Sequence, residues 1–175
     1  METFEEYLIP IKGLDPGVHL FDFRLTDEFF AEFADSPIKG AHLRVRVVLD
    51  KRETMMLWAF EVSGTVDTTC DRCMEPIKLP VHASHDLIVK YGPKEEKGDV
   101  VYIPINEPDF QLARFLYEFS CLTIPMVKVY DCQEEDPPPC NFEVLDRLEA
   151  DEEQADGQHQ TLGEQLKNLG LNPEK

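Results

Sequence analysis

The chain has 175 residues, of which 42% are hydrophobic, so it is long enough to form one domain with a real core. Its 17 basic and 35 acidic side chains give a formal net charge of −18. The surface as a whole is therefore expected to repel the phosphate backbones of nucleic acids. The apolar runs are too short to span a bilayer, and the acidic start, Glu2 to Glu6, is unlike a secretory signal. We therefore expect a cytoplasmic protein with reduced thiols.

The first half of the chain alternates apolar and polar residues, which is the pattern of half-buried strands. Residues 18–25 predict a strand, and Thr26 then predicts the N-cap of a helix that continues to about Asp35. Residues 42–49 and 54–66 predict two strands of an antiparallel hairpin, because a polar turn separates them.

Further strands follow in the second half. Residues 77–91 predict a long strand, in which Pro80 indicates an edge position or a break. A charged loop is expected over residues 92–98, and a short strand over residues 100–103.

The apolar spacing then changes to that of a helix. We expect this helix to be capped by Asp109 and ended by Pro125, and a second, short helix over residues 141–148. Low hydrophobicity and many acids predict disorder beyond it. The expected fold is thus α+β: an antiparallel β-rich single domain with a few short helices over residues 1–148, and a disordered acidic C-terminal tail over residues 149–175.

The most specific chemistry lies in the turn between the two longest predicted strands, where Cys70 and Cys73 precede Pro76. Two thiols at this spacing can bind a soft metal ion, form a disulfide, or line a tight turn, and all three readings stay open. His82 and His85 lie on opposite faces of their predicted strand, so they cannot both be ligands. If zinc is bound, the candidate ligands are Cys70, Cys73, Cys140 and, fourth, Cys132.

A small basic cluster stands out in the acidic chain. Arg44 and Arg46 share one face of their predicted strand, and Lys51 and Arg52 follow closely. Arg44 and Arg46 are therefore candidate contacts to a nucleic acid, or alternatively part of a solvated strand face.

The acids are concentrated near the C-terminus. Residues 131–156 contain eleven acids and a single base, Arg147. Such a segment attracts basic partners, or it simply keeps the protein in solution. The sequence holds no phosphate-cradling glycine loop, nucleophile elbow or metalloprotease helix motif, so catalysis is the weaker hypothesis.

Three segments together resemble a known family. They are the turn with Cys70, Cys73 and Pro76, the stretch 104–112, and the helical stretch 116–125. Over residues 15–148 the chain resembles the YceD-like family, the large ribosomal RNA subunit accumulation proteins of bacteria and plastids. The resemblance implies a non-enzymatic role in ribosome biogenesis, in the processing or accumulation of large-subunit ribosomal RNA.

Charge and resemblance lead to one main hypothesis. The protein is expected to bind a basic ribosomal protein of the large subunit, pre-ribosomal RNA, or both, with no membrane and no small-molecule substrate. The alternative is a zinc- or thiol-dependent enzyme that uses Cys70 and Cys73. A third hypothesis is an adaptor whose tail folds on a partner.

Overall fold

The computed structural model describes residues 4–93, 95–97, 100–129 and 140–148. The chain divides into two compact units, residues 1–71 with 76–130, and residues 72–75 with 131–175. The tail predicted over residues 149–175 lies outside the described residues, so the boundary at residue 148 stays a prediction. Among the described residues, no helix is both long and apolar enough to cross a bilayer.

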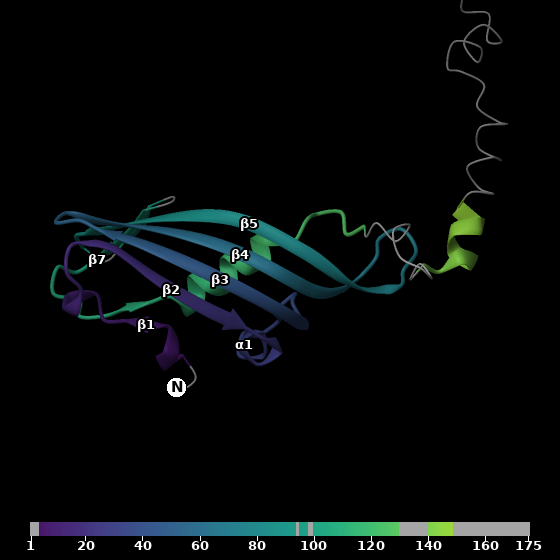
Figure 1. The fold of residues 1–175 in the computed structure, drawn as a ribbon, viewed down its shortest axis with the longest axis horizontal. Helices are drawn as coiled ribbons and strands as arrows, with labels where there is room; N and C mark the ends of the chain where they lie inside the picture. Colours follow the sequence, from purple (N-terminus) through teal and green to yellow (C-terminus); the bar gives the residue numbers. More distant parts are fainter. Residues whose placement is uncertain (1–3, 94, 98–99, 130–139, 149–175) are drawn as a thin grey trace, which may run out of the picture. The chain divides into compact units, whose positions relative to one another are not determined.

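A six-stranded sheet forms most of the first unit (Figure 1). Its spatial order is β2-β3-β4-β5-β7-β6, and every neighbouring pair is antiparallel except β5 and β7. The predicted α+β, antiparallel β-rich fold is therefore confirmed, with one parallel pair added. The strands are β2 (Gly17–Leu25), β3 (Gly40–Lys51), β4 (Met55–Thr69), β5 (Pro76–Tyr91), β6 (Glu95–Lys97) and β7 (Val100–Ile103).

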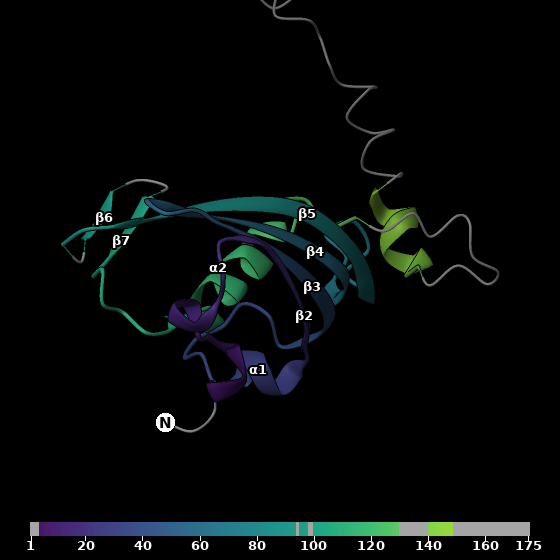
Figure 2. The same cartoon turned by 60° about the vertical axis from the view of Figure 1, so that its left-hand side comes forward.

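The sheet curves over the helix α2 (Ala113–Thr123), which packs against one face only (Figure 2). One-sided burial explains the alternating sequence of β3, in which Val45 and Val47 are fully buried and Arg46 between them is exposed. We call the face away from α2 the outer face. Short elements complete this unit: η1 (Glu5–Tyr7), β1 (Leu8–Ile9), η2 (Ile11–Gly13), α1 (Asp27–Ala31) and β8 (Phe110–Gln111).

Aromatic side chains fill the space between the sheet and α2. Trp58 of β4 is 1% exposed and stacks on Phe110, with ring centroids 5.3 Å apart. Phe60 packs against Phe119 of α2, with centroids 4.8 Å apart. These contacts join the centre of the sheet to the segment around α2, so they fix where the residues before α2 lie.

Local predictions were wrong at one helix end and one helix start. Thr26 is the N-cap residue of α1 as predicted, but its side chain makes no capping hydrogen bond, and the helix ends at Ala31 instead of about Asp35. Asp109 caps no helix, because α2 begins only at Ala113. The Gln111 side-chain oxygen accepts a hydrogen bond from the Ala113 amide instead, at 3.0 Å.

Strand pairing accounts for the other differences. Phe110 and Gln111 form β8, which pairs with β1, and three residues of the expected 92–98 loop form β6, which pairs with β7. Pro80 was read correctly as an edge signal, since β7 pairs with β5 only from Ile88 to Tyr91.

The second unit has one described helix, over residues 142–148. This helix was expected over residues 141–148, and Asn141 caps it, because its side-chain oxygen accepts a hydrogen bond from the Val144 amide at 3.4 Å. The backbone oxygen of Asn141 also accepts bonds from Val144 and Leu145, which starts the helix.

Candidate functional site

The outer face of the sheet carries the predicted arginines. Arg44 and Arg46 project from β3 on the side opposite Val45 and Val47, as their spacing predicts. Their side chains are 61% and 52% exposed. The structure thus leaves both guanidinium groups accessible from solvent.

Beside Arg44 the outer face is hollowed. Arg24 of β2 lies directly opposite Arg44 in the strand register, and Ser63 of β4 lies opposite Arg44 on the other side. We call the depression around them, with a volume of about 370 Å³, the cationic hollow. It is lined by Arg24, Leu25, Thr26, His42, Leu43, Arg44, Ser63 and Gly64.

Gly64 shapes the floor of this hollow. Its φ is +145°, in a region that side-chain-bearing residues rarely adopt. A Cβ atom at this position would overlap the backbone oxygen of His42 and approach Leu43 Cα. The register passes through Gly64 without interruption, so the glycine allows close approach of β3 and β4 and does not mark a bulge.

Ion pairs surround the arginines without neutralising the hollow completely. Arg44 Nη2 lies 3.0 Å from Asp22 Oδ1, and Arg46 Nη1 lies 3.4 Å from Glu61 Oε2. Such exposed pairs contribute at most about 1 kcal/mol each, so a phosphate can compete for these cations. The Arg24 side chain makes no ion pair with a described residue.

Arg24 was missed in the sequence-based prediction. Its position in the alternating pattern of residues 18–25 shows that Arg24 faces outward, but only the strand register shows that it lies opposite Arg44. Two like charges in directly opposed positions repel one another, so a bound anion between them would be favoured. The best candidate set for a phosphate contact is therefore Arg24, His42 and Arg44, with Arg46 beside it.

The cysteine turn joins β4 to β5, as predicted. Thr69 at the end of β4 pairs with Pro76 at the start of β5. Cys70 and Cys73 are each only 3% exposed, and Met74 has a φ of +61°. Such burial gives little access to a substrate, so it does not favour the thiol-enzyme hypothesis.

Asp71 ties the start of this turn to the segment after α2. Its amide donates to the Lys128 backbone oxygen at 2.8 Å, and its Oδ2 accepts from the Lys128 amide at 2.8 Å. Lys128 Nζ also lies 3.5 Å from Asp71 Oδ1. Backbone and side chain together therefore hold this part of the loop in one conformation.

The predicted zinc site stays a prediction. Cys132 lies outside the described residues. Cys140 is disulfide-bonded, contrary to the expectation of reduced thiols, so it could bind a metal only after reduction. Among the described residues, no three His, Cys, Asp or Glu side chains form a group that could hold a metal ion.

The two histidines of β5 do face opposite ways. His82 is exposed on the outer face, whereas His85 points inward and stacks on Phe119, with ring centroids 4.8 Å apart. Burial lowers the pKa of His85, and the nearby Asp86 opposes this shift. His85 is therefore a neutral packing residue near pH 7.

Cys121 in α2 is not suited to nucleophilic chemistry. Burial raises the pKa of its thiol, although the hydrogen bond with Tyr117 lowers it in part. The thiol is thus protonated near neutral pH, and the thiolate is the reactive form.

Comparison with known proteins gives a family. Residues 58–169 match the family described as large ribosomal RNA subunit accumulation protein YceD, which is more than half of the chain. The chain belongs to the YceD family. The description names a role in accumulation of large-subunit ribosomal RNA and no catalysed reaction. No curated protein and no solved structure matches the chain.

The YceD match has different limits from the predicted resemblance. It begins in β4 and continues to residue 169, whereas residues 15–148 were expected. It includes the cysteine turn and, from the cationic hollow, Ser63 and Gly64. Arg24 and Arg44 precede residue 58 and lie outside the matched region.

Proposed function

We propose that this YceD-family protein supports accumulation of large-subunit ribosomal RNA by binding assembly components in the cytoplasm, without catalysing a reaction. The cationic hollow contacts the RNA, and the acidic remainder of the chain binds a basic ribosomal protein of the large subunit. The observation that carries the proposal is the convergence of Arg24, His42 and Arg44 in a chain of net charge −18.

The hollow suits a phosphate group better than a base. The residues that line it include no Phe, Tyr or Trp, and the large aromatic side chains of β4 face α2. Stacking on aromatic rings is how proteins usually bind unpaired bases, and the imidazole of His42 is the one ring in the described lining. We therefore propose contacts to the RNA backbone, which position the RNA without reading its sequence.

The negative charge has a separate role in the proposal. Phosphate backbones are repelled by most of the surface, so RNA is restricted to the hollow. A cationic ribosomal protein is attracted by the same field, and its encounter with this chain is accelerated. One protein can in this way hold an RNA segment and a ribosomal protein at different places.

The test is RNA affinity as a function of salt. The full chain is titrated with a single-stranded fragment of large-subunit precursor RNA, and an Arg24→Gln, Arg44→Gln double variant is compared with it. Losing two phosphate contacts should reduce the slope of log Kd against log salt by about 1.4. The matched control, Arg52→Gln with Lys39→Gln, removes the same charge away from the hollow and should leave most of the slope.

Equal slopes for the two double variants would contradict the assigned RNA contact.

The protein partner is tested separately, by affinity purification of the full chain from cytosol at low salt. Recovery of large-subunit ribosomal proteins that are released by moderate salt is the expected result. Recovery of neither ribosomal protein nor ribosomal RNA would contradict the proposed function.

A further inference from the structure

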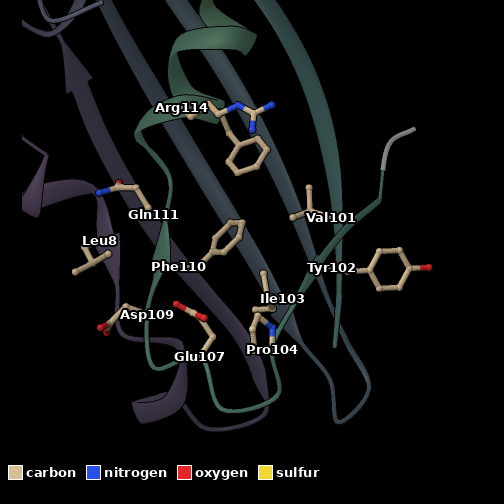
Figure 3. A pocket seen from close by; sticks show the side chains of 11 residues that line it. Leu8, Val101, Tyr102, Ile103, Pro104, Glu107, Asp109, Phe110, Gln111 and Arg114 are labelled. Atoms are coloured by element: carbon tan, nitrogen blue, oxygen red, sulfur yellow. The ribbon is translucent and has the colours of Figure 1, made fainter. Parts of the chain in front are cut away.

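A second depression lies at the other side of the first unit, between β7 and β8 (Figure 3). Its volume is about 610 Å³. Ile103, Phe110 and Phe115 form its apolar floor and are 5–8% exposed, and Leu8 adds a side chain that is 41% exposed. We call this depression the acidic groove, because Glu107 and Asp109 stand at its rim.

The charge of the groove is negative. Glu107 and Asp109 form no ion pair with the described residues. Arg114 is the one base among the described lining residues, and its Nε lies 2.7 Å from Glu118 Oε1 in an exposed pair. The described lining therefore has two carboxylates against one guanidinium, around an apolar floor.

We propose that the acidic groove binds an extended, cationic peptide segment that inserts one bulky apolar side chain. The apolar floor gains free energy by excluding water from that side chain, and the carboxylates favour lysine or arginine on either side of it. An RNA segment is excluded by the same carboxylates, because phosphates would be repelled. The assignment of this segment to a large-subunit ribosomal protein rests on the proposed function. The assignment of its chemistry, cationic with one bulky apolar side chain, rests on the groove alone.

The sequence around the groove supports this assignment. The stretch 104–112, one of the three that carry the YceD resemblance, supplies Pro104, Glu107, Asp109, Phe110 and Gln111 to its lining. Val101 to Phe115 lie inside the matched region, so most of the groove belongs to the part shared with the family. Leu8 is the exception, and it reaches the groove because β1 pairs with β8.

The chain contains its own reporter of occupancy. Trp58 is the single tryptophan, and it stacks on Phe110, whose ring lies on the groove floor. A side chain that packs on Phe110 should therefore change the fluorescence of Trp58. No label is required, and the full chain can be used.

The experiment is a fluorescence titration with three capped hexapeptides that lack tryptophan. The first alternates leucine with arginine, the second replaces leucine by serine, and the third replaces arginine by glutamate. We expect saturable binding of the first peptide alone. Equal binding of the serine peptide would overturn the role of the floor, and equal binding of the glutamate peptide would overturn the role of the carboxylates.

Two variants locate the binding. Glu107→Gln with Asp109→Asn should raise Kd for the first peptide about tenfold, from the loss of two exposed charge contacts. Glu32→Gln with Glu53→Gln removes the same charge from exposed positions outside the groove and should change Kd much less. Leu8→Ser, at a lining position that is 41% exposed, should also weaken binding. Equal Kd values for the two acidic double variants would refute the proposal.

The outcomes separate this proposal from the proposed function. Failure of all three peptides to bind, with ribosomal components still recovered from cytosol, would overturn the groove assignment alone. Specific peptide binding without any recovered ribosomal component would leave the groove as a peptide site and overturn the ribosomal origin of its ligand.

Discussion

Replacement of Gly64 by alanine should destabilise the protein strongly and distort the cationic hollow. Two costs add at this position. The φ of +145° is strained for alanine, and its Cβ would overlap the His42 backbone oxygen on the neighbouring strand. Because the overlap is with backbone, β3 and β4 must move apart to relieve it.

The magnitude follows from these two terms. A strained backbone conformation of this kind costs about 1–3 kcal/mol. Forcing extra volume into a packed region costs about 1–3 kcal/mol more. A total of about 4 kcal/mol is a large part of a typical unfolding free energy, and it corresponds to a fall in Tm on the order of 10 °C.

Two other glycines serve as controls in the same assay, thermal unfolding followed by circular dichroism. Gly17 has a φ of +133° but nothing within 4 Å of its would-be Cβ, so Gly17→Ala measures strain alone. Gly13 has neither feature, so Gly13→Ala should be nearly neutral. The expected order of Tm loss is Gly64, then Gly17, then Gly13. If Gly64→Ala costs no more than Gly17→Ala, β3 and β4 do not approach as described.

Two further predictions concern His85 and Asp71. Burial lowers the pKa of His85, so the neutral ring stabilises the fold fully above pH 6.5, and this stabilisation is lost as the pH falls toward the lowered pKa. The variant His85→Phe can keep the stack on Phe119 and has no such proton to bind. It should therefore lose less unfolding free energy between pH 7.5 and 5 than the unchanged protein. An equal loss in both proteins would exclude His85 as the cause. Asp71→Ala should cost about 1 kcal/mol and accelerate hydrogen exchange of the Lys128 amide, because that amide loses its acceptor. Lys128→Ala, which keeps the backbone bond, should change this exchange little, and similar acceleration in both would contradict the assignment.

The site was predictable only in part. The alternation of side chains along one strand was enough to place Arg44 and Arg46 on a solvent-exposed face. It could not place Arg24 beside them, since β2 and β3 are separated by α1 and their register depends on which residues the core buries. The acidic groove was not predicted, because its lining comes from Leu8, β7, the residues before α2 and the first turn of α2, which only the fold brings together.

The amino-acid sequence alone determined the strand-rich class, the hairpins around the polar and cysteine turns, and the family resemblance, because these depend on alternation and short motifs within local segments. The tertiary structure decided where an expected helix start and an expected loop formed strands instead. Residues 110–111 follow Asp109 in an apparent helix start, yet they pair with residues 8–9 as β8, and the charged residues 95–97 pair with β7. In both places a partner distant in sequence or a sheet edge satisfies the backbone hydrogen bonds, and that gain outweighs local propensity. The two proposed binding sites lie where such distant segments meet.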